Sequence, residues 1–365
     1  MRTETSIWSA LVILAWAASA QAQTTIDIGG RLHVDGALYD EDVTELGGGT
    51  ELRRARLFAE GALAEDWDYK FEFDFNDGEV TPTDTYVQYK GLSLGTLKIG
   101  QFKMPFSLEE QTSSRFITFM ERAMINEFVP GRRIGVGYEA TQRGLTFGAA
   151  MFGQEAGDNA EDEGVGAAAR VAYAFRPREG ALVHLGLGGA YEEPETTDTP
   201  SDVVRIRARP ESHVTSTRLV DTGELAAARS RTSLGLEFAA VYGSLSAQAE
   251  YIQQSLDTEG GDFDFGGYYA YVSWFPGGQS RPYKDGKFDR VQAENAWEFG
   301  LRFSSLDLDD GTVAGGEEDN VTVGANYYVN PHLRFMLNYV MVDSERAGVS
   351  DEPDILEARL SLDFQ

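Results

Sequence analysis

Long segments that alternate strictly between apolar and polar residues recur along almost the whole chain. In DYKFEFDF (68–75) the aromatic side chains fall on one face of an extended strand, and Lys70, Glu72 and Asp74 fall on the other. The segments AWEFGLRF (296–303) and HLRFMLNYVMV (332–342) repeat this pattern. A period of two residues is that of a β-strand. The alternation therefore predicts an all-β fold.

Two kinds of β-fold produce such alternation. In a soluble sandwich the apolar face packs on a second sheet, whereas in a membrane barrel it meets lipid and the polar face lines a wet lumen. The segments here are about 9–11 residues long, which is the length that a tilted membrane strand needs. Their polar faces carry charges of both signs. The sequence therefore predicts a transmembrane antiparallel β-barrel.

Sixteen strands can be placed, and the turns between them alternate in length. Tight turns such as 141–144 and 330–331 alternate with long polar connections such as 153–165 and 193–230, as in outer-membrane barrels. The connection 275–294 is long where a short one is expected. We expect both chain ends on the short-turn, periplasmic side. The predicted strands are 26–39, 51–64, 67–77, 83–90, 95–102, 133–141, 144–152, 166–175, 181–192, 231–242, 244–255, 266–274, 295–304, 319–329, 332–343 and 354–364.

The first residues indicate export. Arg2 precedes an apolar run from Ile7 to Ala18, and an A-x-A site ends at Ala22. This is the pattern of a secretory signal peptide, and the run is too short for a membrane-spanning helix. We predict a signal peptide over residues 1–22, one barrel domain over residues 23–365, and a location in the outer membrane of a Gram-negative cell.

The net charge of −28 argues against nucleic-acid binding, because an acidic protein repels phosphate backbones. Many acidic residues fall in the predicted long connections, and we expect them on the outer rim. They are either simply solvated or bridge to lipopolysaccharide through divalent cations. These residues are Asp40, Glu41, Asp42, Glu45, Asp158, Glu161, Asp162, Glu163, Glu192, Glu193, Glu195, Glu317, Glu318, Asp319, Asp351, Glu352 and Asp354.

The residue types that carry catalysis are scarce. The chain has no cysteine, and its four histidines are isolated in the sequence. It has no G-x-S-x-G motif, paired-histidine motif or nucleotide-binding loop. We expect no enzymatic activity, no cofactor and no metal. By contrast, 25 arginines stand against 6 lysines, and the planar guanidinium suits fixed binding of anions. A GC-rich genome would also produce this excess of arginine.

The segment GQFKMPFSLEEQTSSRFITFMERA (100–123) breaks the alternation. It belongs to the third long connection, over 103–132, which we expect to fold inward and narrow the lumen, as it commonly does in sixteen-stranded barrels. Four apolar side chains can anchor it to the wall: Phe106, Phe116, Ile117 and Phe119. Four polar ones can face ions: Ser113, Ser114, Arg115 and Arg122.

Segments of this chain resemble, in the same order, those of the phosphate-selective porin O and P family. The resemblance covers nearly the whole mature chain, and its most specific parts are T-S-S-(R/K)…E-R and A-E-Y…G-Y-Y. It implies a homotrimer of sixteen-stranded barrels, each with its own anion-conducting pore. The matching segments are GRL (30–32), RRARLFAEG (53–61), FSLEEQTSSRFITFMERA (106–123), VHLGLGGAYEE (183–193), VRIRAR (204–209), LSAQAEYIQQ (245–254), GGYYAYVSWF (266–275) and RPYKDGKFD (281–289).

The resemblance also implies ion-binding residues. At the constriction they are Arg31, Arg53, Arg54 and Arg122, with Ser113 and Ser114 as hydroxyl donors and Asp84 close by. On an arginine ladder in the long fifth outer loop they are Arg205, Arg207 and Arg209. A dehydrated oxyanion must regain its lost hydration from several donors at once, and arginine supplies them in pairs.

Alternation puts Arg54 and Arg56 on one face and Arg53 on the other. A bulge is therefore needed if Arg53 and Arg54 are both to face the lumen.

The chain departs from the family at two places, Asp68 and Glu110, where phosphate-specific members resemble one another in carrying lysine. Outer-membrane strands also usually end on an aromatic residue, whereas here Gln365 follows Phe364. Lys284 and Lys287 are the residues that best fit a lower basic cluster.

Three hypotheses follow from these observations. The chain is an anion channel, with phosphate or a related oxyanion as its solute; a general or cation-preferring porin in which acids such as Asp68 and Glu110 dominate; or an outer-membrane enzyme or adhesin. The first two differ in whether Arg31, Arg54 and Arg122 converge without carboxylate partners.

Overall fold

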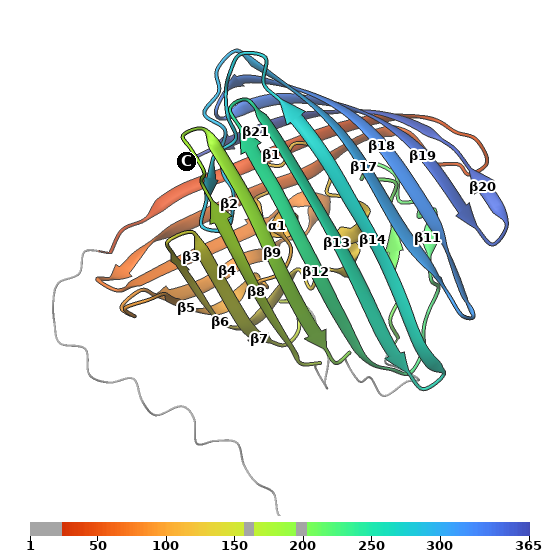
Figure 1. The fold of residues 1–365 in the computed structure, drawn as a ribbon, viewed down its shortest axis with the longest axis horizontal. Coiled ribbons are helices and arrows are strands. Elements are labelled where there is room, and N and C mark those ends of the chain that lie inside the picture. Colours follow the sequence, from red (N-terminus) through yellow and green to blue (C-terminus); the bar gives the residue numbers. More distant parts are fainter. Residues whose placement is uncertain (1–23, 157–163, 195–202) are drawn as a thin grey trace, which may run out of the picture.

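The computed structural model describes residues 24–156, 164–194 and 203–365, which form a closed antiparallel β-barrel (Figure 1). The ring closes because the first strand, β1, pairs both with β2 and with the last strand, β21. Sixteen strands make up the wall, so the predicted all-β barrel is confirmed. The predicted signal peptide lies outside the described residues.

The wall strands follow the order of the chain around the ring. They are β1 (Asp27–Asp40), β2 (Gly49–Ala64), β3 (Trp67–Asp74), β4 (Thr81–Tyr89), β5 (Thr96–Lys103), β6 (Arg132–Gln142), β7 (Leu145–Phe152), β8 (Gly166–Phe175), β9 (Ala181–Glu192), β12 (Ala228–Tyr242), β13 (Leu245–Thr258), β14 (Gly261–Trp274), β17 (Ala296–Asp310), β18 (Val313–Asn330), β19 (Leu333–Arg346) and β21 (Asp354–Phe364).

The remaining elements are short and lie in the connections. They are η1 (Asn76–Gly78), α1 (Leu108–Gln111), η2 (Met124–Phe128), β10 (Arg207–Ala208), β11 (Val220–Asp221), β15 (Tyr283–Lys284), β16 (Lys287–Phe288) and β20 (Val349–Asp351). Within the described residues, none of the helices has the length and apolar character needed to cross a bilayer.

The alternation in the sequence separates an outer from an inner face. In β17 the apolar Trp297 and Leu301 remain about half exposed on the outside, whereas Glu298 and Arg302 are buried on the inside. Charged residues therefore fill the interior of the barrel, and they need partners there, because a buried charge without a partner is costly.

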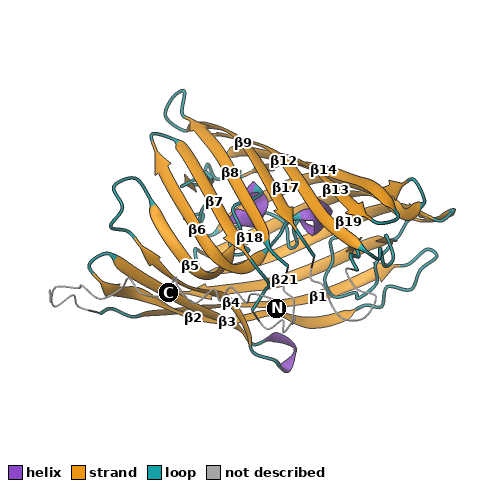
Figure 2. Ribbon diagram, turned by 90° about the horizontal axis from the view of Figure 1, so that it is seen from below, coloured by secondary structure: helices purple, strands orange, loops and turns teal. Residues whose placement is uncertain are grey.

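The wall is low on one side and high on the other (Figures 1 and 2). Strands β3, β4 and β5 have 8, 9 and 8 residues, whereas β17, β18 and β19 have 15, 18 and 14. The connections at one end of the barrel are mostly tight, such as 65–66, 143–144, 243–244 and 331–332. Connection 275–295 is the long exception at that end, as predicted from the sequence.

Two connections at the other end differ from the prediction. The regions 256–265 and 305–318 were expected to be long loops, but the strands continue through them to tight turns at 259–260 and 311–312. Alternation continues into these extensions, since Leu306 and Leu308 alternate with Asp307 and Asp309, but the acidic and glycine residues around the turns resemble a loop.

Some acids predicted in long loops consequently lie in strands. Glu317, Glu318 and Asp319 belong to β18, and Asp40, Glu192, Asp351 and Asp354 also lie in strands near this end of the barrel. Of the acids predicted on the rim, Asp158, Glu161, Asp162, Glu163 and Glu195 lie outside the described residues.

The segment 104–131, between β5 and β6, lies inside the barrel (Figure 2). It packs against buried side chains of several wall strands. Phe106 lies on Gly188 and Gly235, which face each other on β9 and β12. Phe119 lies on Gly300 and Gly324, which face each other on β17 and β18. A Cβ atom at any of these glycines would come within 2.9–3.1 Å of the phenylalanine ring. Paired glycines therefore make room for the two anchoring rings.

Candidate functional site

Two cavities inside the barrel meet at two arginines. The inner cavity, of about 350 Å³, is lined by residues of β1 to β6, of segment 104–131 and of connection 275–295. The outer cavity, of about 230 Å³, is lined by β2 and by parts of 104–131 and of the long connection 193–227. Arg54 and Arg122 line both. The two cavities therefore adjoin at Arg54 and Arg122, and this place is called the passage below.

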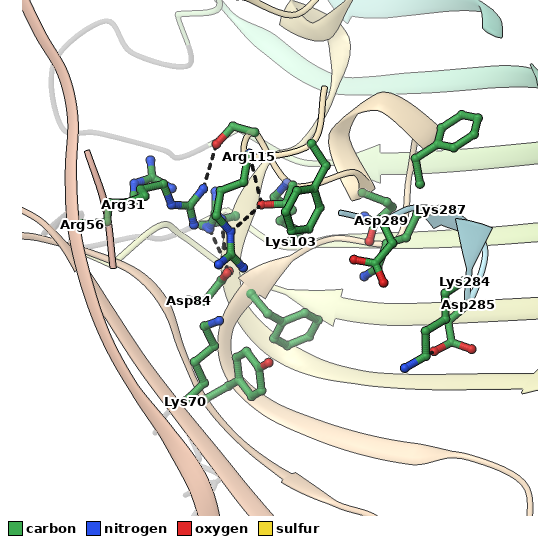
Figure 3. Close-up of a pocket in the computed structure, with 18 of the residues that line it drawn as sticks. Arg31, Arg56, Lys70, Asp84, Lys103, Arg115, Lys284, Asp285, Lys287 and Asp289 are labelled. Atoms are coloured by element: carbon green, nitrogen blue, oxygen red, sulfur yellow. Dashed lines mark hydrogen bonds and ion pairs between the residues drawn. The ribbon is translucent and has the colours of Figure 1, made fainter. Parts of the chain in front are cut away.

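The inner cavity is strongly cationic although the chain as a whole is acidic (Figure 3). Five of the chain's six lysines line it, and eleven cationic side chains there face four carboxylates. The cations are Arg31, Arg54, Arg56, Lys70, Lys98, Lys103, Arg115, Arg122, Arg132, Lys284 and Lys287; the carboxylates are those of Asp84, Glu139, Asp285 and Asp289. Fixed positive charge in a confined, low-dielectric space raises the local concentration of anions.

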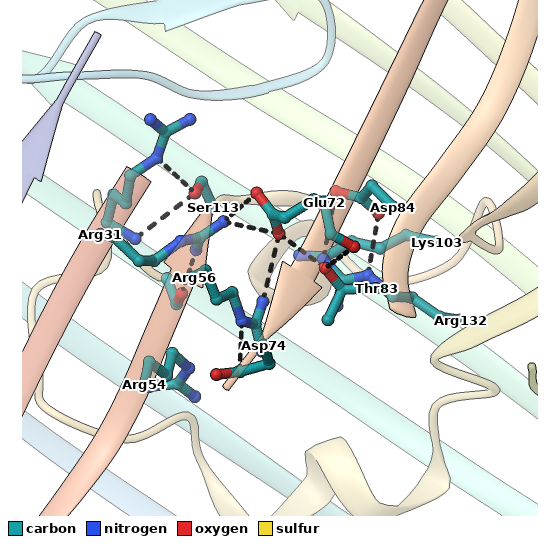
Figure 4. A network of polar contacts seen from close by, with 12 residues as sticks. Arg31, Arg54, Arg56, Glu72, Asp74, Thr83, Asp84, Lys103, Ser113 and Arg132 are labelled. Atoms are coloured by element: carbon teal, nitrogen blue, oxygen red, sulfur yellow. Dashed lines mark hydrogen bonds and ion pairs between the residues drawn. The ribbon is translucent and has the colours of Figure 1, made fainter. Parts of the chain in front are cut away.

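Arg31 of β1 is tied to both the wall and segment 104–131 (Figure 4). Its Nη1 donates to Ser114 Oγ over 2.8 Å, and its Nη2 donates to the two carboxylate oxygens of Glu72 over 3.0 and 2.9 Å. Ser113 Oγ accepts the backbone N–H and the Nε–H of Arg115, each over 3.4 Å. The two predicted serines thus lie at the site, with Ser114 engaged by Arg31.

A bulge brings Arg53 and Arg54 to the same region. The register between β1 and β2 shifts so that His33 pairs with Arg54 and Val34 pairs with Leu52, which leaves Arg53 as the extra residue. The Nε and Nη2 atoms of Arg53 donate to the carboxylate of Glu121, each over 2.9 Å, and Arg54 Nη1 lies 3.7 Å from Glu121 Oε1. The bulge that was needed to bring Arg53 and Arg54 to the same region is therefore present.

Arg122 holds the end of helix α1. It donates to the backbone carbonyls of Glu109, Glu110 and Thr112 over 3.1, 3.3 and 3.0 Å, and these are carbonyls that a helix C-terminus leaves without partners. Its Nε also lies 3.3 Å from Glu110 Oε2, and Glu110 Oε1 lies 3.2 Å from Lys103 Nζ. Burial disfavours ionisation of Glu110, but the charges of Arg122 and Lys103 outweigh it and hold the pKa of this carboxyl at about 2.

The predicted constriction arginines therefore converge, but each has a carboxylate partner. Arg31 pairs with Glu72, Arg54 with Glu121 and Arg122 with Glu110. Asp84 pairs with Arg132, at 2.8 Å from Nε.

Several basic residues of the site were not among the residues predicted to bind anions. Arg56 pairs with Asp74 at 2.5 Å and with Glu72 at 3.5 Å, and alternation alone places it beside Arg54. Arg115, already expected to face ions, has no described carboxylate within 4.0 Å and packs over the ring of Phe116. Arg132, which pairs with Asp84, could not be found by alternation, because alternation places it on the apolar face of Ile134 and Val136.

Only one of the three arginines predicted to form a ladder lines a cavity. Arg209 lines the outer cavity, together with the unpredicted Arg218. Arg207 is exposed and lines neither cavity. Arg205 also lines neither, and its guanidinium is paired with Asp221 over 2.8 and 2.5 Å.

The two departures from the family occupy different places. Asp68 pairs with Lys90 at 2.8 Å near the short-turn end of β3 and lines neither cavity. Glu110 lies at the passage itself, where it contacts Lys103 and Arg122. Of the two acids, Glu110 is therefore the one that contacts cations of the inner cavity.

Connection 275–295 reaches the site from the opposite end of the barrel. Arg281 pairs with Glu298 at 3.0 Å and donates to the carbonyl of Phe116 over 2.9 Å. Arg170 of β8 donates to the carbonyl of Gly286 over 2.8 Å. These contacts hold Lys284 and Lys287 at the inner cavity, where the sequence placed a lower basic cluster. Among the described residues, no group of three histidine, aspartate or glutamate side chains is arranged to hold a metal ion.

Comparison with known proteins identifies close sequence relatives. The family model described as phosphate-selective porin O and P matches residues 26–364. An uncharacterized protein of Caulobacter vibrioides is 31% identical, with 94% of this chain and 73% of that protein covered. Porin O of Pseudomonas aeruginosa is 28% identical, with 95% of this chain and 90% of that protein covered.

Solved structures with the same fold are much more distant in sequence. The anion-selective porin from Comamonas acidovorans superimposes with a TM-score of 0.61 at 13% identity, with 94% of this chain and all of that chain covered. OmpT of Vibrio cholerae, in its trimer form, gives a TM-score of 0.57 at 15% identity, with 93% and 99% covered.

Proposed function

Because the chain belongs to the phosphate-selective porin O and P family, we propose that it is a diffusion channel for anions, with phosphate or a related oxyanion as its solute. The observation that carries this proposal is the inner cavity, where eleven cations face four carboxylates in a chain of net charge −28. The family and the fold place the protein in the outer membrane and indicate a channel rather than an enzyme.

We infer that segment 104–131 is the constriction of this channel. Its hydrogen bonds reach Arg31 of β1, Asn326 of β18 and Arg334 of β19, so it is held from several sides. An oxyanion that leaves water there would meet Arg54 and Arg122 first from either cavity. Binding at such a point has to be strong enough for entry and weak enough for release.

A permeating anion would move between the fixed cations that line the outer cavity and those that line the inner cavity. Arg209 and Arg218 supply the outer cavity with cations, and the five lysines supply the inner one. A lysine ammonium is a compact charge on a flexible stem, which suits transient contacts better than fixed binding. The arginines at the passage are instead held by hydrogen bonds to protein groups.

A general or cation-preferring porin is the second candidate. It is favoured by one observation, namely that Arg31, Arg54 and Arg122 all have carboxylate partners. If those pairs cancel the charge at the passage, the acidic rim would attract cations instead. We place this candidate second because Arg115 and Lys287 line the inner cavity and have no described carboxylate within 4.0 Å.

We further propose a homotrimer. Strands β3 and β5 have only 8 residues. At 3.4 Å per residue and a tilt of roughly 40°, such a strand rises about 21 Å, which is less than the ~25 Å apolar band of a barrel that faces lipid. A low wall of this kind is suited to contact with neighbouring barrels. Cleavage after Ala22, a single domain over residues 23–365, and contact of the acidic rim with lipopolysaccharide belong to the same proposal.

Current through planar bilayers tests the function. Phosphate added to a chloride solution should block the chloride current at concentrations well below that of chloride, because it competes for the same cations with more charge and more acceptor oxygens. A chloride current that phosphate leaves unchanged would favour the general porin.

A further inference from the structure

Two carboxylates of segment 104–131 contact the two arginines shared by the cavities: Glu121 lies 3.7 Å from Arg54, and Glu110 lies 3.3 Å from Arg122. Glu121 lines the outer cavity, and Glu110 contacts Lys103 and Arg122, which line the inner one. Both glutamates are on the same segment as Arg122 and are held in place with it.

Glu121 receives the contacts that a small oxyanion would receive. The guanidinium of Arg53 binds its two oxygens as a fork, each over 2.9 Å, and Arg359 Nη2 lies 2.5 Å from its Oε1. Arg54 Nη1 approaches the same oxygen to 3.7 Å. A paired approach of this kind is the strong form of carboxylate and phosphate recognition by arginine. A protein carboxylate thus occupies three guanidinium groups at the passage.

Glu110 likewise binds two cationic side chains that line the inner cavity. Its oxygens lie 3.2 Å from Lys103 Nζ and 3.3 Å from Arg122 Nε. Since the pKa of Glu110 is held at about 2, and opposing charges hold that of Glu121 well below its ordinary value despite burial, both groups carry a negative charge at neutral pH.

We propose that Glu110 and Glu121 are intrinsic counter-ions of the passage, which compete with the permeating anion for the same cations. The anion therefore binds weakly and leaves quickly. This inference rests on the proposed anion-channel function and adds what sets the affinity of the channel.

The cations keep enough other partners for the fold to survive loss of either charge. Arg359 also forms a fork with Asp35 over 2.7 and 2.6 Å. Lys103 donates to the backbone carbonyl of Glu110, and Arg122 donates to three backbone carbonyls. Arg53, by contrast, has Glu121 as its one described carboxylate within 4.0 Å. Loss of the Glu121 charge would therefore release Arg53 toward the outer cavity.

The test compares Glu110→Gln, Glu121→Gln and their combination with the parent chain in planar bilayers. The readout is the inorganic phosphate concentration that halves the chloride current. Each substitution should lower it roughly tenfold, because a cation released from a charged partner gains an equivalent contact with phosphate. Dissociation of phosphate should slow in proportion. Glu259→Gln is the matched control, since it removes the same charge outside both cavities and its partner Arg229, at 3.8 Å, lines neither of them.

Slow migration of the unheated protein on gels shows which variants are folded, and if Glu121→Gln fails to fold, Glu110→Gln alone decides. If phosphate blocks the parent channel but the phosphate concentration for half-block is the same in the folded variants, Glu110 and Glu121 are not counter-ions that compete with the anion. The proposed anion channel would still hold in that case. A parent channel that passes potassium in preference to chloride would overturn both.

Discussion

Arg281 donates a hydrogen bond to the backbone carbonyl of Phe116 over 2.9 Å. This contact joins connection 275–295, which starts from the short-turn end of the barrel, to segment 104–131, which starts from the other end. Phe288 and Leu108 extend it, because both belong to one buried apolar cluster. The two segments therefore support each other inside the barrel.

Removing the contact between Arg281 and Phe116 should make segment 104–131 more mobile at the passage. Arg281 is paired with buried Glu298 at 3.0 Å, so the single variant Arg281→Met would also leave an unpaired charge, at a cost of about 3–5 kcal/mol. The double variant Arg281→Met, Glu298→Gln avoids this while a glutamine at 298 can still accept from Asn326 and Tyr328, so it tests the contacts that Arg281 makes. We expect larger fluctuations in its single-channel current at an unchanged mean conductance. A double variant with a current as steady as that of the parent would contradict a supporting role.

Arg122→Ala should affect anion binding more than conductance. The substitution removes the donors to three carbonyls around α1 and leaves Glu110 with Lys103 as its remaining partner. The phosphate concentration for half-block should rise roughly tenfold, which corresponds to one charge-assisted contact. Arg122→Lys should recover only part of this, because an ammonium cannot reach the carbonyls as a fork does. Equal losses of anion and cation current would count against the assignment.

Lys287→Ala should lower the chloride conductance in a salt-dependent way. Lys287 lines the inner cavity, and none of the described carboxylates lies within 4.0 Å of its ammonium group. We expect roughly half the conductance at 0.1 M KCl and little change at 1 M, because the screening length falls from about 10 Å to about 3 Å. Lys90→Ala is the control, since Lys90 pairs with Asp68 at 2.8 Å and lines neither cavity. Equal effects of the two substitutions would contradict a role of the inner cavity.

Glu109 should make stability depend on pH. Burial raises the pKa of its carboxyl from 4.5 to about 7, although Arg302 and Arg122 oppose the shift. The folded chain therefore holds this proton between about pH 4.5 and 7 while the unfolded chain releases it. The free energy of unfolding should fall across that window as pH rises, by up to about 3 kcal/mol.

Glu109→Gln should remove this part of the pH dependence, and its heat resistance at pH 8 should exceed that of the parent. The measurement is the temperature at which the folded band disappears from unheated gels between pH 5 and 8. A parent and a variant with parallel pH profiles would show that Glu109 stays ionised in the fold.

Most of the fold could be predicted from the sequence, because apolar and polar residues alternate with the two-residue period of a β-strand. Trp297 and Glu298 belong to opposite faces in any register, so the sixteen strands could be placed without the structure. The extensions to the turns at 259–260 and 311–312 were missed although Leu306 and Leu308 alternate with acids there, because the acidic and glycine residues around the turns resemble a loop.

The site was predictable in its residues but not in its pairing. Alternation and resemblance brought Arg31, Arg54 and Arg122 to one place, and the structure has them there. A face assignment says nothing of partners far away in the chain, and Glu121 reaches Arg53 across 68 positions. For that reason the sequence indicated an arginine-lined passage, and the carboxylates within it emerged from the structure.

The most direct test of anion selectivity is the zero-current potential of the reconstituted protein across a KCl gradient, measured before and after phosphate is added. An anion channel should give a potential of the sign set by chloride selectivity, and a chloride current that phosphate blocks. A potential of the sign given by potassium selectivity, unmoved by phosphate, would contradict it and show that Glu110, Glu121 and the acidic rim govern the pore.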